Sequence, residues 1–287
     1  MILDAMSLLF RSFYALPPMN TADGTPTNAL YGLSSLFLKL IREHRPRALA
    51  FAVDLPKPTF RHVAYPDYKQ GRAKKPDPLR QQLARFGQWM ASLQVPVHAQ
   101  EGFEADDVIA TLATKLDDVL VVSGDTDLFQ VVTDDVRVWF VGRRQRDAVM
   151  MDRAAVEARY TVGATSIPTI KALMGDSSDN LPGLHGVGVK TAASWIRAHG
   201  DAQGIVDAVA HLTPARHRPI VQAHAADLVT WEELATVRRD VPLDGPWAAP
   251  LTAASFAGLD AEFEALELQS LRPRLARIVA DLEHESS

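Results

Sequence analysis

The sequence contains no cysteine among its 287 residues. Disulfide bonds, thiolate zinc sites and cysteine nucleophiles are therefore excluded, and any metal ion must be held by oxygen or imidazole ligands. No run approaches the roughly 20 apolar residues of a transmembrane helix. The N-terminus, from Met1 to Asp4, lacks the basic start and apolar core of a signal peptide. We expect a soluble, cytoplasmic protein with no membrane partner.

A large charge of one sign is also missing. The chain carries 30 basic and 35 acidic residues, a formal net charge of −5, and 47% of its residues are hydrophobic. This ordinary globular mixture excludes a disordered tail, a collagen and a coiled-coil rod. The small negative charge is weak evidence against a nucleic-acid partner. The charges are unevenly distributed along the chain, however, and the functional argument rests on that distribution.

The first half of the sequence alternates short β-rich runs with helical patterns. We predict strands at residues 1–3, 48–53, 95–98, 119–122 and 136–141, and helices at residues 7–16, 28–44, 78–93 and 105–116. This alternation indicates a mostly parallel sheet covered by helices on both faces. From about residue 152, helical patterns with short turns follow. We therefore predict an α/β core over residues 1–160 and a helical region over residues 161–287.

Acidic residues follow several of the predicted strands. Those directly after a strand are Asp4, Asp54, Asp125 and Asp127. A second group opens the helix after the strand at residues 95–98, namely Glu104, Asp106 and Asp107, and a later turn contains Asp176 and Asp179. Ligands of parallel sheets bind beyond the carboxyl ends of the strands. We therefore expect these carboxylates to gather at one edge of the sheet.

Each acidic group also has a simpler interpretation. Acids in the first turn of a helix suit its dipole, and Asp, Ser and Asn are common in turns without any further role. Taken together, the carboxylates would repel one another by roughly 4 kcal/mol per pair at about 4 Å and an effective dielectric constant near 20. Such a cluster persists if divalent cations neutralise it or if some of its members are protonated, and oxygen ligands favour Mg²⁺ or Mn²⁺. Two such ions suit in-line hydrolysis of a phosphodiester.

Basic residues gather in one stretch, residues 57–90. It contains eight basic residues against two acidic ones, and Tyr65 and Tyr68 lie among them. Lysine and arginine next to aromatic rings suit single-stranded nucleic acid, through phosphate contacts and base stacking. The alternative is a solvated, charged loop and helix face. The stretch complements the acids, because metal ions would hold the scissile phosphate and basic groups its neighbours.

A glycine-rich turn follows the last pair of acids. It runs Gly183-Leu184-His185-Gly186-Val187-Gly188 and is followed by Lys190. Glycines allow a backbone to approach a phosphate closely, and the amides at the start of the next helix point toward an anion. Any tight turn between two helices can contain glycine, so the pattern alone is ambiguous.

Several motifs, in this order, resemble those of the 5′-nuclease family, and the closest resemblance is to the 5′→3′ exonuclease domain of bacterial DNA polymerase I. Phage 5′ nucleases and flap endonucleases belong to the same family. The motifs are Leu3-Asp4, Arg11-Ser12-Phe13-Tyr14-Ala15, Phe60-Arg61, Tyr68-Lys69-Gln70-Gly71-Arg72, Glu104-Ala105-Asp106-Asp107, Gly124-Asp125-Thr126-Asp127, Gly175-Asp176-Ser177-Ser178-Asp179-Asn180 and Gly183 to Ala192. Ala5 and Val189 depart from the family pattern, which has glycine and an acidic residue there.

The resemblance implies a fold and a set of roles. The fold would be a PIN-like core with a basic helical gateway at about residues 57–90 and a helix-hairpin-helix at about residues 170–200. First-metal ligands would be Asp4, Asp54, Glu104, Asp106 and Asp125, and second-metal ligands Asp107, Asp127, Asp176 and Asp179. Catalytic roles would fall to Lys69, Arg72 and Asp125. The residues that would contact DNA are Arg11, Tyr68, Lys69, Arg72, Gly186, Gly188 and Lys190. Among them, Tyr68 can stack on a nucleotide. The family often binds a K⁺ ion at the hairpin.

The implied function is a structure-specific 5′ nuclease of replication and repair. It would use two Mg²⁺ or Mn²⁺ ions to cleave DNA at 5′ ends and 5′ flaps, leaving a 5′-phosphate and a 3′-hydroxyl, and would need no oligomer. One alternative is a protein that binds branched DNA without cutting it. A second alternative is a metal-dependent phosphohydrolase that acts on small phosphates. The basic stretch and the glycine-rich turn would have no function in such an enzyme.

Overall fold

The computed structural model describes residues 1–71, 73–142 and 147–285. Its centre is a sheet with the strand order β3-β2-β1-β4-β5-β6, and β7 pairs with the start of β2. The strands are β1 (Ile2–Asp4), β2 (Ala48–Ala52), β3 (Val97–His98), β4 (Val119–Ser123), β5 (Val136–Phe140), β6 (Val149–Met151) and β7 (Ala249–Pro250). Pairing is parallel from β3 to β5, whereas β6 and β7 pair antiparallel. The predicted mostly parallel sheet is confirmed.

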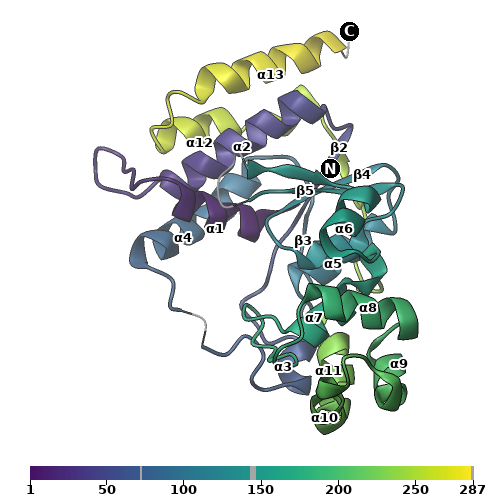
Figure 1. Ribbon diagram of the computed structural model, residues 1–287. Coiled ribbons are helices and arrows are strands. Elements are labelled where there is room, and N and C mark those ends of the chain that lie inside the picture. The colour runs from purple at the N-terminus through teal and green to yellow at the C-terminus, as the bar shows by residue number, and fades with distance from the viewer. Residues whose placement is uncertain (72, 143–146, 286–287) are drawn as a thin grey trace.

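Helices flank this sheet and continue beyond it (Figure 1). They are α1 (Ala5–Ala15), α2 (Asn28–His44), α3 (Phe60–Ala64), α4 (Asp77–Ala91), α5 (Ala105–Ala113), α6 (Arg153–Tyr160), α7 (Ile167–Met174), α8 (Val189–His199), α9 (Ala202–Asp207), α10 (Arg218–Ala223), α11 (Ala225–Ala235), α12 (Leu259–Ala265) and α13 (Arg272–Glu285). Within the described residues, no helix combines the length and the apolar character needed to cross a membrane.

Two apolar clusters cover the two faces of the sheet. On one face, α1, α2 and α4 pack around Phe37, Phe51 and Trp89, all of which are buried. On the other face, α5 and α6 pack against Val121 and Val138 of the central strands. Because both faces are covered, the central strands β1, β2 and β4 are apolar up to their last residue, and their polar groups gather where the strands end. This arrangement leaves the carboxyl edge of the sheet for a site.

A third apolar cluster holds α7 to α11 together next to the sheet (Figure 1). Trp195 and Trp231 are buried in it, and α7 packs against both α8 and α11. α11 ends at Ala235, because the backbone after it becomes extended and bonds to side chains of the α/β core. The helical region is thereby tied to the sheet at that point.

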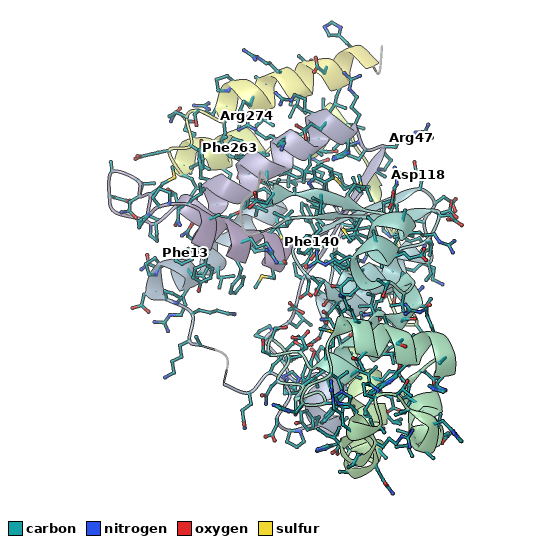
Figure 2. All side chains as sticks on the ribbon, viewed as in Figure 1. Phe13, Arg47, Asp118, Phe140, Phe263 and Arg274 are labelled. Carbon is teal, nitrogen blue, oxygen red and sulfur yellow. The ribbon has the colours of Figure 1, made fainter. Side chains whose placement is uncertain are left out.

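The C-terminal part of the chain lies elsewhere than predicted. Residues 249–285 were expected in the helical region, but β7 pairs with β2, α13 packs on α2, and α12 packs on α13 and α4 in the first cluster. Phe263 of α12 is fully buried there, in the C-terminal part of the chain that lies beside α2 (Figure 2). The chain returns to the core because its C-terminal helices cover apolar residues of α2 that would otherwise face water.

The basic stretch is only partly helical. α3 and α4 are helices, but residues 66–71 form turns and residues 73–76 have no regular secondary structure. α3 lies beside α11, whereas α4 lies on the other side of the molecule (Figure 1). Gln82 of α4 is buried and accepts hydrogen bonds from the amides of Ala29 and Leu30 in α2, which fixes α4 there. The basic stretch therefore connects two distant parts of the fold.

We expect the C-terminal helices to contribute to global stability. Replacing Phe263 with alanine should lower the free energy of unfolding by about 3–5 kcal/mol, because it leaves a cavity in the first cluster. The control Val149→Ala removes a side chain that is 46% exposed and should change it by about 0.5 kcal/mol or less. Urea unfolding measures both. An unchanged value for Phe263→Ala would mean that these helices fold separately from the core.

Candidate metal centre

Four of the predicted acidic residues form a first cluster at the carboxyl edge of the sheet. Asp4 ends β1 and begins α1, where it accepts a hydrogen bond from the amide of Ser7 at 3.1 Å and one from the hydroxyl of Ser123. Asp54 follows β2 and accepts from the amide of Ala105 at 2.8 Å. Asp106 stands in the first turn of α5. Asp125 follows β4, so that four different elements each supply one carboxylate.

The electrostatics show that these four carboxylates face one another. Burial raises the pKa of Asp4 to about 7, and repulsion from Asp54 and Asp125 adds to it, against opposing hydrogen bonds from Ser123 and Ser7. The pKa of Asp106 is also raised, by burial and by the charges of Asp125, Asp4 and Asp54, while Lys69 opposes the shift. Without a cation, part of this cluster is held neutral by protons.

Glu104 lies between this cluster and the basic stretch. It caps α5, and its carboxylate contacts the Lys69 ammonium at 2.7 Å and the Tyr68 hydroxyl at 3.0 Å. The Arg61 guanidinium lies 3.5 Å away. Glu104 is 8% exposed, so these contacts replace most of its contact with water.

A second cluster consists of Asp127, Asp176 and Asp179. One carboxylate oxygen from each lies within 4.8 Å of the others, close enough for a shared ion. Asp127 begins the 3₁₀ helix Asp127–Val131, and the other two stand in the turn after α7. The ammonium of Lys171 contacts both Asp127 and Asp176. Burial alone would raise the pKa of Asp176, but Lys171 and hydrogen bonds from Ser178 lower it to about 2.

The turn that holds Asp176 and Asp179 depends on glycine. Asp176 and Leu181 exchange backbone hydrogen bonds, both at 2.8 Å. Gly183 has a φ of 66°, and a Cβ added there would lie 2.1 Å from the amide nitrogen of Gly175. No other residue fits such a close approach. Glycine in this motif is therefore needed for the backbone of the turn that carries the acids of the second cluster.

Asp107 lies outside both clusters, although it was predicted as a second-metal ligand. Its two oxygens accept hydrogen bonds from the Arg61 guanidinium at 2.7 and 2.8 Å, and from the amides of Glu104 at 3.0 Å and Arg238 at 2.8 Å. The side chain is fully buried. These four bonds use the oxygen positions that a metal ion would need, so the geometry assigns Asp107 to a structural ion pair.

The position of Tyr68 also differs from the prediction. Its ring was expected to stack on a nucleotide, but the residue is only 3% exposed. The hydroxyl lies 3.0 Å from Glu104 and 2.9 Å from Asp179, which belong to different parts of the site. A buried ring offers no face to a base, so in this arrangement Tyr68 connects the acidic residues instead of binding nucleotides.

Lys69 lies at the site, as predicted. Its ammonium contacts Glu104 at 2.7 Å and lies 3.6 Å from Asp179, and its backbone adopts the left-handed conformation with a φ of 55°. Its amide donates to the carbonyl of Asp179 at 3.1 Å. The lysine is therefore anchored by both backbone and side chain. Arg72, the other predicted catalytic cation, lies outside the described residues.

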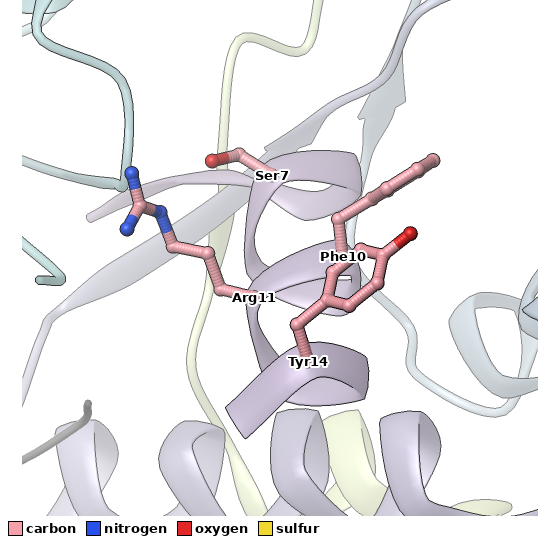
Figure 3. A pocket seen from close by; sticks show the side chains of 4 residues that line it. All are labelled: Ser7, Phe10, Arg11 and Tyr14. Atoms are coloured by element: carbon pink, nitrogen blue, oxygen red, sulfur yellow. The ribbon is translucent and has the colours of Figure 1, made fainter. Parts of the chain in front are cut away.

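Arg11 extends from α1 toward the first cluster. Its guanidinium donates a hydrogen bond to the carbonyl of Gly124, next to Asp125. The negative charges of Asp125 and Asp4 favour the charged form of this guanidinium. Together with Ser7, Phe10 and Tyr14 it lines a pocket of about 450 Å³ on α1 (Figure 3). The sequence motifs gave neither ring a role, although Phe10 and Tyr14 lie four residues apart, the spacing of one helix face.

The helix-hairpin-helix prediction corresponds to α7, the turn at residues 175–188, and α8. Gly188 is the N-cap of α8, and Gly186 has a φ of 80°. Both glycines and Lys190, in the first turn of α8, are exposed. The free amides at the start of α8 and the lysine thus face solvent, where an anion can approach them.

Both acidic clusters fit hard divalent ions, because every donor in them is oxygen. The second cluster has the spacing for a shared ion. The first has buried carboxylates whose mutual repulsion a cation would relieve.

Comparisons with known proteins agree with this geometry. Residues 1–161 match the family of the 5′-3′ exonuclease, N-terminal resolvase-like domain, and residues 162–256 match the 5′-3′ exonuclease, C-terminal SAM fold. The chain belongs to the 5′→3′ exonuclease family. The resemblance seen in the sequence motifs is thereby confirmed.

Two relatives show how far the similarity extends. DNA polymerase I of Mycobacterium tuberculosis is 39% identical over 282 residues, which cover 96% of this chain and 31% of that protein. The 5′-3′ exonuclease of Aquifex aeolicus is 39% identical over 209 residues, 71% of each chain. This chain thus spans about a third of the length of the polymerase relatives that it matches.

Solved structures share the fold at lower identity. The T5 D15 protein co-crystallised with metal ions has a TM-score of 0.68 and 19% identity, covering 100% of this chain and 99% of that one. The catalytic core of Rad2 in complex with a DNA substrate has a TM-score of 0.63 and 14% identity, covering 98% and 91%. These similarities confirm the expected fold, an α/β core with a helical region.

Asp107 offers a direct test of its structural assignment. Asp107→Asn should lower the free energy of unfolding by about 3–5 kcal/mol, because it removes the bidentate countercharge of the buried Arg61 and leaves only Glu104, 3.5 Å away. Asp134→Asn, which breaks an exposed pair with Arg153, should cost about 1 kcal/mol or less. Urea unfolding gives both values. If Asp107→Asn kept full stability but lost a bound divalent ion, the ligand role would be correct after all.

The raised pKa of Asp4 predicts a pH dependence of stability in EDTA. Between about pH 4 and pH 7 the folded protein keeps a proton on this carboxyl that the unfolded chain has lost. The free energy of unfolding should therefore fall as pH rises through this window, with a slope of up to about 1.4 kcal/mol per pH unit. Asp4→Asn should reduce the slope, whereas the exposed control Asp134→Asn should not. Equal slopes in Asp4→Asn and the unchanged protein would contradict the assignment.

Proposed function

We propose that this protein is a structure-specific 5′ nuclease of replication and repair. It cleaves phosphodiester bonds of DNA at 5′ ends and 5′ flaps and leaves a 5′-phosphate and a 3′-hydroxyl. The observation that carries the proposal is the pair of acidic clusters, joined through Glu104, Tyr68 and Asp179, with Lys69 between them. A cytoplasmic location is part of this proposal.

The two clusters would each hold one Mg²⁺ or Mn²⁺ ion. The first site would comprise Asp4, Asp54, Glu104, Asp106 and Asp125, and the second Asp127, Asp176 and Asp179. When bound, such ions lower the pKa of an attacking water and neutralise charge on the leaving oxygen. Hydrogen bonds from the protein hold the buried Asp4 and the exposed Asp54 in position while the ions are exchanged.

Basic side chains of the chain itself would orient the phosphate. The Lys69 ammonium lies between the clusters, where a phosphate oxygen can replace Glu104 as its partner. Arg11 lies beside Asp125 and can contact a neighbouring phosphate. We retain Arg72 as a second gateway cation on its sequence position alone.

Duplex DNA would be held away from the acids. The exposed start of α8, with Gly186, Gly188 and Lys190, presents amides and a positive charge to a phosphate backbone. The turn itself would also bind a K⁺ ion. Among the structural neighbours, the T5 D15 flap endonuclease forms a pseudo-enzyme-product complex with DNA and metal ions, and the Rad2 core binds a DNA substrate. These complexes support DNA as the partner of this chain, and no oligomer is needed for the site.

Two competing functions make different predictions. A branched-DNA-binding protein would bind a flap without forming product, and the retained acids of both clusters argue against it. A phosphohydrolase of small phosphates would not be inhibited by DNA, and the exposed hairpin turn with Lys190 and the basic stretch argue against this alternative.

The decisive experiment uses a duplex with a 5′-labelled flap and Mg²⁺. We expect shortened labelled product with Mg²⁺ and none with EDTA, and the remaining strand should carry a 5′-phosphate. Asp125→Asn and Asp127→Asn should each lower the cleavage rate by about 100-fold or more while DNA binding is kept or strengthened, because repulsion of the phosphates falls.

The control is Asp134→Asn, an exposed aspartate on the surface, which should cleave at the unchanged rate. Cleavage at the unchanged rate by both Asp125→Asn and Asp127→Asn would disprove the metal assignment. Tight binding without any product would favour the non-cleaving alternative.

A further inference from the structure

Lys171 is a buried cation that the proposed mechanism does not use. It lies in the last turn of α7 and is 9% exposed. Its ammonium contacts the carboxylates of Asp127 and Asp176, both members of the second cluster. The lysine therefore lies where the second divalent ion is expected to bind.

The surroundings keep Lys171 in this position. Its backbone carbonyl accepts the hydrogen bond from Gly175 that ends α7, at 2.8 Å, so its backbone is fixed directly before the acidic turn. The neighbouring Thr169 is tied to Glu232 of α11. Only the flexible stem of the lysine is free to move the ammonium, by rotation about its side-chain bonds.

Charge explains what this lysine does for the cluster. Asp127, Asp176 and Asp179 are close together and mostly buried, and three such carboxylates repel one another strongly. One ammonium in contact with two of them offsets part of that repulsion. A divalent ion at the same place would offset more, but it needs the oxygens that Lys171 contacts, and two cations repel each other.

We propose that Lys171 is the resident cation of the second cluster, and that a divalent ion binds there only by displacing its ammonium from Asp127 and Asp176. This inference rests on the proposed metal-dependent function. It assigns to Lys171 two effects: it stabilises the metal-free protein, and it weakens binding of the second ion. The displaced ammonium would gain a phosphate of the bound DNA as its new partner.

The test measures Mn²⁺ binding by calorimetry on the full chain at constant pH, without DNA. For the unchanged protein we expect two classes of site, and Asp176→Asn should abolish one of them, which identifies the second cluster. Lys171→Met should tighten that same class by about tenfold or more. Lys171→Arg keeps the charge and should leave it weak, and Lys115→Met, an exposed lysine after α5, should change nothing.

Thermal unfolding gives a second readout that does not depend on cleavage. In EDTA, Lys171→Met should melt at a lower temperature than Lys115→Met, because the three carboxylates lose their countercharge. Saturating Mn²⁺ should remove most of this difference, since the ion takes over the role of the ammonium. This recovery also shows that the variant folds.

The outcomes separate the inference from the proposed function. Two classes of Mn²⁺ site that are unaffected by Lys171→Met would overturn the role of Lys171 and leave the metal centre intact. Loss of the second class in Lys171→Met would also overturn it, because the lysine would then support the ion. No Mn²⁺ binding to the unchanged protein would overturn the metal centre itself, and this inference with it.

Discussion

Repulsion between buried carboxylates is the constraint on which this structure depends. The parallel sheet brings the ends of β1, β2 and β4 together, and each is followed by an aspartate. Without metal ions, the fold relieves this repulsion in two ways. Protons remain on the first cluster, where the pKa of Asp4 is raised to about 7, whereas Lys171 supplies the positive charge at the second. The two halves of the site thus differ chemically before any metal binds.

A buried ion pair holds the elements around the site in place. Arg61 of α3 bonds to Asp107 of α5 and to the carbonyls of Leu234 and Thr236, where the helical region ends. Asp107 in turn accepts from the amide of Arg238. This network joins the start of the basic stretch, the helix that carries Glu104 and Asp106, and the return of the chain to the core. An ion pair so thoroughly hydrogen-bonded specifies one arrangement of these elements.

The sequence was sufficient to predict the mostly parallel sheet and the edge at which the acids gather, because apolar strands followed by aspartates have few other arrangements. It could not predict which acid is a ligand. Asp106 and Asp107 are neighbours, but side chains one residue apart on a helix point about 100° apart. One therefore faces the first cluster and the other Arg61. The return of residues 249–285 to the core was not predicted either, because an apolar pattern does not show which element a helix packs against.

Tyr68 and Lys69 show how the basic stretch and the acidic edge depend on each other. Both side chains contact Glu104 and lie near Asp179, so one short turn connects to both halves of the site. A cation or phosphate that engages Glu104 or Asp179 must compete with these two residues for the same oxygens. Because the turn is anchored to Asp179 through its backbone as well, such competition strains the turn instead of simply freeing a side chain. The charge state of the acidic edge and the position of the basic stretch are therefore linked by shared oxygen atoms.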